Sequence, residues 1–233
     1  MPGQDEVHVW TVLVPDIMPY LPELEQVLSS GETQRAARFV RPVDRCRYIA
    51  AHGILRQLLG GYLGLAPAGL EFVANDFGKP SLAPGAGRTP LSFNLTHSGD
   101  VILYVFGDGR HVGVDVEAIR TDLNIMELAQ GQFSPQEIAT LQATNPSDQT
   151  GAFFRCWTRK EAYLKARGEG LGFPLKQFAV SFGNDEPTAL LWAADDSSAS
   201  ERWSVFDLVP APGYAAAVVS EGRPGRVVGQ CWP

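Results

Sequence analysis

The sequence predicts an α+β fold in which a lobe made of a helix and an antiparallel sheet occurs twice, with pseudo-twofold symmetry. The chain has 233 residues, enough for one domain or for two lobes of roughly one hundred residues each. In each half, a helix-rich segment precedes several short strand-like segments. Two pairs of segments also resemble each other across the halves: LEFVANDFGKPSL with FAVSFGNDEPTAL, and SGDVILYVF with PGYAAAVVS. We therefore expect lobes at residues 1–115 and 116–233, with a ligand site at the seam between them.

The first half begins with a strand-like segment and continues with a helix-rich one. Val7–Val14 is apolar enough for a strand, and Thr33–Leu63 carries apolar residues at roughly helical spacing. Gly60, Gly61 and Gly64 are expected to help end that helix. Four strands should follow, at Leu70–Ala74, Leu91–Leu95, Val101–Phe106 and Val112–Val116.

The second half is expected to repeat this order. A helix is predicted over Gly151–Arg167. Strands should follow at Phe178–Phe182, Ala189–Trp192, Ser204–Val209 and Ala215–Ser220. The Pro/Gly-rich tract Pro80–Pro90 predicts a surface loop within the first lobe, and the hydrophilic stretch Ala193–Glu201 predicts an exposed turn.

Charge and cysteine content indicate which ligands, metal sites and cellular location to expect for this protein. The formal net charge of −7 argues against bulk binding of nucleic acid or membranes, so an anionic ligand would need a local basic cluster. Cys46, Cys156 and Cys231 lie far apart, which indicates neither a disulfide framework nor a zinc site and favours a reducing, cytoplasmic location. The N-terminal segment has no basic region, and Pro15 and Asp16 break its apolar run. We therefore expect no signal peptide and no membrane span.

Three acidic residues in two short motifs give the clearest chemical signal. Asp115 and Glu117 straddle Val116 in the strand-like run VGVDVEAI, so both carboxylates should lie on one face. Glu161 lies in the helical segment FFRCWTRKEAYLKARGEGL, one turn before Lys165. Mg²⁺ takes oxygen ligands and leaves positions for water and substrate phosphates, which suits three acids without a cysteine or histidine cage. A cation one turn from a metal ligand is then placed to neutralise a bound phosphate.

The helix that carries Glu161 is expected to separate core residues from site residues. Phe153, Phe154, Trp157 and Leu164 form an apolar face, whereas Lys160, Glu161 and Lys165 project elsewhere. Taken alone, the four-residue spacing of Glu161 and Lys165 would favour an exposed ion pair worth about 0.3–0.5 kcal/mol.

Four motifs in this order resemble the signature segments of the 4′-phosphopantetheinyl transferase superfamily. They are DFGKP at 76–80, FNLTHSGD at 93–100, VGVDVEAI at 112–119 and WTRKEAYLKARGEGL at 157–171. The size and duplication are similar to the larger, two-lobed class that serves polyketide and nonribosomal peptide synthases. The resemblance implies an Mg²⁺-dependent enzyme that transfers the phosphopantetheine arm of coenzyme A to a serine of an acyl or peptidyl carrier protein. It also implies that adenosine 3′,5′-bisphosphate is released.

The resemblance implies a role for each matching position. The metal ligands would be Asp115, Glu117 and Glu161, and the catalytic residues Glu161 and Lys165. The residues expected to bind coenzyme A are Arg47, Gly78, Lys79, Pro80, Thr96, His97, Lys160 and Lys165. Thr96 stands where serine is commoner in the family but retains a hydroxyl. Arg35 and Arg38 lie where the family supplies further basic residues, in a loose register. The base that deprotonates the serine is either Glu161 or a metal-activated water.

Each of these residues also has an ordinary structural explanation when taken alone. Asp115 and Glu117 would suit a strand end, His97 a turn before Ser98-Gly99, Lys79 a solvated turn and Arg47 a solvated helix. For the three acids, Lys165 and His97, joint occurrence in the right order favours the functional interpretation.

Glu137 follows Ser134 and Pro135 in the form of a capping box, and we assign it that structural role. Trp157 and Phe153 are expected in the core.

Two other functions use the same residues. Another Mg²⁺-dependent phosphoryl or nucleotidyl transferase would need the acids, but the chain has no GK[ST] loop and no GxGxxG motif. A non-catalytic binder of carrier proteins or coenzyme A would be expected to lack a metal ligand, and all three acids are present.

The segment at 120–133 (RTDLNIMELAQGQF) is the expected contact for the carrier protein. It presents Leu123, Ile125, Met126 and Leu128 in an otherwise polar stretch. Because carriers are often acidic and this chain is acidic too, docking should depend on apolar contacts and local basic residues. Two lobes in one chain predict a site that is complete within a monomer.

Overall fold

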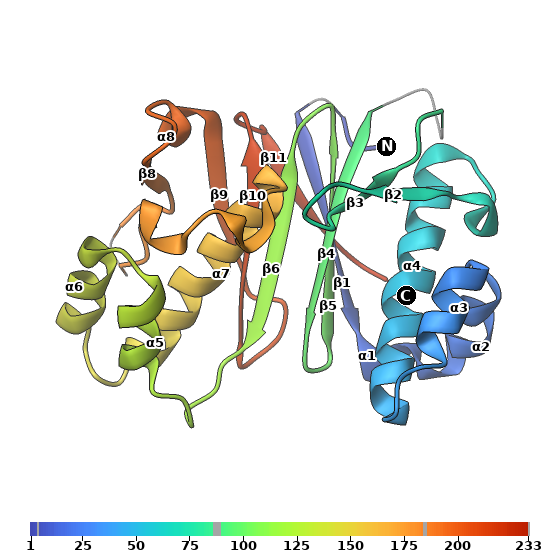
Figure 1. Cartoon of the computed structure of the whole chain (residues 1–233), viewed down its shortest axis with the longest axis horizontal. Helices are drawn as coiled ribbons and strands as arrows, with labels where there is room; N and C mark the ends of the chain where they lie inside the picture. Colours follow the sequence, from blue (N-terminus) through green and yellow to red (C-terminus); the bar gives the residue numbers. More distant parts are fainter. Residues whose placement is uncertain (4, 86–89, 184–185, 233) are drawn as a thin grey trace.

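The computed structural model shows two β-sheets packed face to face between two long helices (Figure 1). It describes residues 1–3, 5–85, 90–183 and 186–232. Helix α4 (Pro42–Leu63) covers the outer face of one sheet, and helix α7 (Gln149–Arg167) covers the outer face of the other. The α+β fold class is therefore confirmed.

The predicted duplication is visible in the order of the strands. In the first repeat the helices and strands are β1 (Glu6–Leu13), α1 (Val14–Ile17), α2 (Leu21–Gln26), α3 (Ser30–Ala36), α4, β2 (Phe72–Ala74), β3 (Pro80–Leu82), β4 (Leu91–Ser98) and β5 (Val101–Asp108). The second contains β6 (Val112–Ala118), α5 (Ile125–Gln132), α6 (Pro135–Ala143), α7, β7 (Phe178–Val180), β8 (Leu190–Ala193), α8 (Ala199–Arg202), β9 (Trp203–Leu208) and β10 (Tyr214–Glu221). The sheets run in the equivalent orders β1-β5-β4 and β6-β10-β9, and β2–β3 and β7–β8 form a small hairpin in each repeat.

Two strands occupy places that differ from the expectation. β6 was expected to end the first half, but it pairs with β10 and opens the second repeat. The expected lobe boundary between residues 115 and 116 thus lies inside β6. The final strand, β11 (Arg226–Cys231), pairs in parallel with β1, so the first sheet is mixed and not purely antiparallel. Strand partners depend on tertiary packing, which local sequence patterns do not encode.

Three apolar clusters hold these layers together. One packs α4 against the first sheet, with Ile54 and Phe106 fully buried. Another packs α7 against the second sheet around Phe153 and Tyr163. The third lies between the sheets and consists mainly of valines from β1, β5, β6 and β10. The seam between the repeats is therefore a packed interior.

The helical segment expected over Thr33–Leu63 is two helices. Residues 37–41 separate α3 from α4, and α4 begins with Pro42 at its first position, where a missing N–H costs nothing. Gly60 and Gly61 lie within α4, and only Gly64 ends it, with φ of 67°.

The two predicted loops also contain regular structure. Pro80–Leu82, at the start of the expected loop, forms strand β3, and residues 86–89 of that loop lie outside the described residues. Ala199–Arg202, at the end of the hydrophilic stretch, forms α8.

Candidate active site at the seam of the two repeats

Helix α7 lies directly on strand β6, and this contact brings the three acids together. Gly113 permits the close approach, because a Cβ atom there would overlap the backbone of Ala162 and Ala166. Asp115 and Glu117 follow on β6, and Glu161 and Lys165 project from α7. Together they line one cavity of about 450 Å³. Its lining residues are Thr96, His97, Asp115, Glu117, Gln132, Trp157, Glu161, Lys165 and Leu175.

Strand β4 supplies hydroxyl groups that orient the carboxylates of β6. Thr96 Oγ1 donates to Asp115 Oδ1 at 3.2 Å, and Ser98 Oγ donates to Glu117 Oε2 at 3.0 Å. Ser98 Oγ also accepts from the Ala118 amide at 3.1 Å. The two-residue spacing of Thr96 and Ser98 matches that of the two acids, so the sheets are joined here by paired side chains.

Lys165 forms the central ion pair of the cavity. Its Nζ donates to Asp115 Oδ1 at 2.6 Å and to Thr96 Oγ1 at 3.0 Å. Asp115 is only 4% exposed, and its second oxygen, Oδ2, is buried without a hydrogen-bond partner. An unsatisfied buried carboxylate oxygen is costly unless a further cation or donor reaches it.

The electrostatics of the cavity favour an added positive charge. Burial is the main cause that raises the pKa of all three acids, Asp115, Glu117 and Glu161. The negative charge of Asp115 raises the pKa of the two glutamates further. Burial lowers the pKa of His97, as do the charges of Lys165 and Arg47. A cation among the acids would relieve their mutual repulsion.

The donor set fits a hard cation, although it is not preassembled. Within the described residues, no three His, Cys, Asp or Glu side chains are close enough to form a metal site. The partnerless Asp115 Oδ2 and the raised pKa values of Glu117 and Glu161 nevertheless indicate oxygen ligands whose negative charge Lys165 compensates only in part.

Lys160 does not belong to this cavity, in contrast to the expectation that it binds coenzyme A. Its Nζ is fully buried and donates at 2.7 Å to each oxygen of Glu137 and to the Phe178 carbonyl. Glu137 completes the predicted capping box, accepting from the amide of Ser134 at 2.8 Å. Lys160 therefore projects into the core between α7 and α6, the side opposite to the one predicted.

Of the other residues expected to bind coenzyme A, Thr96, His97 and Lys165 line the acid cavity, whereas Arg47, Gly78, Lys79 and Pro80 do not. Lys79, after Gly78 and before Pro80, donates from Nζ to two backbone carbonyls, and Lys79 and Pro80 line a separate cavity of about 230 Å³. Arg47 donates to Asp100 Oδ1 at 2.9 Å. A third cavity, of about 460 Å³, is lined by Arg35 and Arg38 together with Gly31, Gln34 and Phe39.

An apolar groove of about 470 Å³ adjoins the acid cavity and shares Glu117 and Trp157 with it. Its other lining residues are Ser98, Gly99, Ala118, Arg120, Leu123, Leu128, Phe153 and Phe154. Trp157 was expected in the core, but it is only partly buried and separates groove from cavity. Sequence reasoning also left Ser98 without a role, although its alternation with Thr96 was a usable signal.

None of the helices in the described part of the chain is long and apolar enough to cross a membrane. All three cysteines are free; Cys156 is buried, and Cys231 is exposed.

Comparisons with known proteins point to one family. Residues 111–219 match the model of the 4′-phosphopantetheinyl transferase superfamily. The chain is 37% identical to the 4′-phosphopantetheinyl transferase HetI of Nostoc sp. over 94% of its own length and 89% of that protein. It is 31% identical to a 4′-phosphopantetheinyl transferase of Bacillus subtilis over 68% of each chain. It is also 41% identical to the 4′-phosphopantetheinyl transferase AcpT of Salmonella typhimurium over 60% of this chain and 69% of that one.

Proposed function

Because this chain belongs to the 4′-phosphopantetheinyl transferase superfamily, we propose that its acid cavity transfers 4′-phosphopantetheine from coenzyme A to a serine of an apo carrier protein. The observation that carries the proposal is the meeting of Asp115, Glu117, Glu161 and Lys165 in one cavity at the seam. Carboxylates for a cation beside a lysine for a phosphate are what transfer at a pyrophosphate requires.

We assign the cation role to Mg²⁺, held by Asp115, Glu117 and Glu161. When bound, Mg²⁺ would neutralise the pyrophosphate and stabilise the charge that develops on the leaving group. The partnerless Asp115 Oδ2 supports this assignment, because it offers a ligand atom that no protein donor uses.

The protein's own residues complete the reaction. The serine oxygen forms a bond to the phosphorus that carries the pantetheine arm, and the P–O bond to adenosine 3′,5′-bisphosphate breaks. Lys165 is placed to hold the phosphate charge beside Asp115, and His97 lines the same cavity. Glu161, whose pKa is raised by burial, accepts the serine proton on a carboxylate oxygen.

Coenzyme A would enter from the side of His97 and Arg47. The two side chains lie close enough to interact, since the charge of Arg47 lowers the pKa of His97. Arg35 and Arg38 line the further cavity and are candidates for the remaining phosphate of coenzyme A.

The apolar groove is the proposed docking place of the carrier helix that bears the serine. It adjoins the acid cavity at Glu117 and Trp157, so a serine at that edge would reach the reacting phosphorus. Leu128 is 39% exposed and lines the groove. Met126, expected as a carrier contact, is instead partly buried against the core of the second repeat, because α5 turns that side inward.

We further propose acyl or peptidyl carriers of polyketide and nonribosomal peptide synthases as partners, a cytoplasmic location and a monomeric enzyme. One copy of the chain supplies every lining residue of the acid cavity, which supports the monomer.

The test is the intact mass of a purified apo carrier after incubation with this protein, coenzyme A and Mg²⁺, beside a reaction with EDTA. A gain of one phosphopantetheine group only in the presence of metal is expected. A gain that persists in EDTA would remove the cation role. No gain with acyl and peptidyl carriers, despite measurable coenzyme A binding, would favour a non-catalytic binder.

A further inference from the structure

A turn of the first repeat forms hydrogen bonds with the C-terminal end of helix α7, which belongs to the second repeat. Asn75 Nδ2 donates to the Gly168 carbonyl at 2.6 Å. Lys79 Nζ donates to the Ala166 carbonyl at 3.2 Å and to the Val112 carbonyl of β6 at 3.1 Å. One lysine thus joins α7 to β6, and both residues belong to the turn between β2 and β3.

The turn itself is rigid, so its two side chains have fixed positions. Asn75 Oδ1 accepts from the amides of Phe77, at 3.0 Å, and Lys79, at 2.9 Å. Gly78 adopts φ of 82°, which a residue with a side chain rarely does. The backbone N–H of Asn75 also donates to the Lys79 carbonyl at 3.1 Å, and this bond closes the turn.

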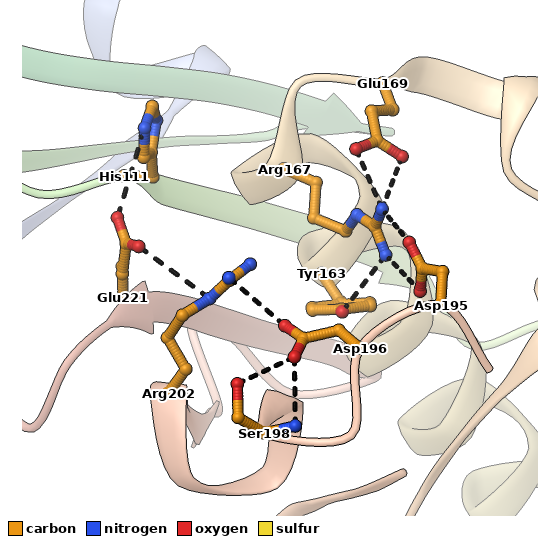
Figure 2. Close-up of polar contacts among 9 residues, drawn as sticks. All are labelled: His111, Tyr163, Arg167, Glu169, Asp195, Asp196, Ser198, Arg202 and Glu221. Carbon is orange, nitrogen blue, oxygen red and sulfur yellow. Dashed lines mark hydrogen bonds and ion pairs between the residues drawn. The ribbon is translucent and has the colours of Figure 1, made fainter. Parts of the chain in front are cut away.

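Arg167, at the end of α7, ties the segment that follows the helix to Asp195 (Figure 2). Its guanidinium donates to Glu169 at 2.7 and 2.8 Å and to Asp195 at 2.6 and 3.1 Å. The ring of Phe77 lies against the same segment, since a Cβ on Gly172 would be 3.1 Å from it. The end of α7 is therefore held both by the turn and by the Arg167 ion pairs.

The chemistry of Lys79 suits this position. The last carbonyls of a helix lack intrahelical partners and carry partial negative charge, so a cation stabilises them. Both acceptors of Lys79 are neutral, and burial lowers its pKa to about 8. Ala166 directly follows Lys165, so the contact acts next to the residue that pairs with Asp115.

We propose that Asn75 and Lys79 form a clasp that holds α7 against β6 and thereby positions Lys165 and Glu161 opposite Asp115. The inference rests on the proposed function and gives Lys79 a positioning role in place of the coenzyme A contact that the family resemblance implies. Misplacement of a catalytic group by about 1 Å costs up to roughly 100-fold in rate, so loss of the clasp should appear in kcat.

The test compares Lys79→Met with Lys176→Met, which alters an exposed lysine away from the clasp. We expect Lys79→Met to lower kcat about 10-fold while the KM values for coenzyme A and carrier change less than about twofold. Lys79→Arg can still donate to both carbonyls and should retain most of the rate. Lys176→Met should match the wild type.

A raised KM for coenzyme A with unchanged kcat would overturn the proposal in favour of ligand binding by Lys79, and unchanged kcat and KM would overturn it as well. If Lys79→Met does not fold, Asn75→Ala provides the same comparison, because it removes the bond to Gly168. Arg202→Gln, which removes the ion pairs to Asp196 and Glu221 and the contact with the Trp203 ring, is its control.

Hydrogen exchange of the last turn of α7 separates this proposal from the proposed function. If the wild type transfers nothing to any carrier, the proposed function fails, and the clasp is judged by exchange alone. Faster exchange at Ala166 and Gly168 in Lys79→Met than in Lys176→Met supports the clasp, because the Gly168 amide closes the helix on the Leu164 carbonyl. Equal exchange would overturn it.

Discussion

Removing one partner of the buried ion pair between Lys160 and Glu137 should strongly destabilise the protein. Lys160 is 0% exposed and Glu137 is 1% exposed, so neither charge is reached by water. Lys160→Met removes three donor contacts and leaves the Glu137 carboxylate with the amides of Ser134 and Val180 as its donors. Breaking a buried pair in this way typically costs about 3–5 kcal/mol. We expect Lys160→Met to lower the free energy of unfolding by about 3 kcal/mol. This is the lower end of that range, because two backbone amides still donate to the Glu137 carboxylate.

Urea unfolding followed by tryptophan fluorescence measures this loss, with Glu137→Gln and the double variant completing a cycle. The double variant removes both charges, so its loss should be smaller than the sum of the single losses by about 2 kcal/mol. Lys176→Met is the control for a lysine at the surface. A loss below about 1 kcal/mol for Lys160→Met, or additive losses in the cycle, would show that the two residues are not a coupled pair in solution.

Four further predictions concern the acid cavity and the groove. Asp115→Asn keeps the side-chain shape and should lower kcat by at least about 100-fold with the fold retained, as measured by transfer rate and circular dichroism; a rate within about threefold of wild type would contradict the site. Glu117→Gln removes a carboxylate whose pKa is raised by burial, so it should raise the Tm of the metal-free protein by about 2 °C in calorimetry, whereas a lower Tm would contradict the repulsion. Burial raises the pKa of Glu161 above its ordinary value of 4.5, so the charged form destabilises the metal-free protein as pH rises through that pKa. Because a cation binds the charged form, Mg²⁺ affinity in calorimetric titration should begin to fall at a pH above 4.5 as the solution is made more acidic. An affinity that does not change with pH would refute the assignment. Leu128→Asp should raise the KM for carrier about 10-fold and leave that for coenzyme A unchanged, with the exposed Leu65→Asp as control; equal effects of both would argue against the groove.

Many of the individual helices and strands could be predicted from local sequence patterns, which do not depend on how the elements pack. The apolar runs at residues 101–106 and 215–220 predicted β5 and β10, because a strand buried on both faces has an apolar sequence. The same reasoning found α7 and the capping box at Ser134. It could not assign β6 to the second repeat or pair β11 with β1, because strand pairing is settled by contacts between residues far apart in sequence.

The sequence by itself determined the α+β class, the duplication and the chemical character of the site, because period-two spacing places Asp115 and Glu117 together and the ordered motifs bring Glu161 and Lys165 with them. Only the tertiary structure decided which charged residues of α7 face the cavity. Lys160 and Glu161 are neighbours in the chain, yet one turns into the core to meet Glu137 and the other into the cavity. Successive helical residues point about 100° apart, and what lies in each direction depends on the elements that pack there, which no local pattern records.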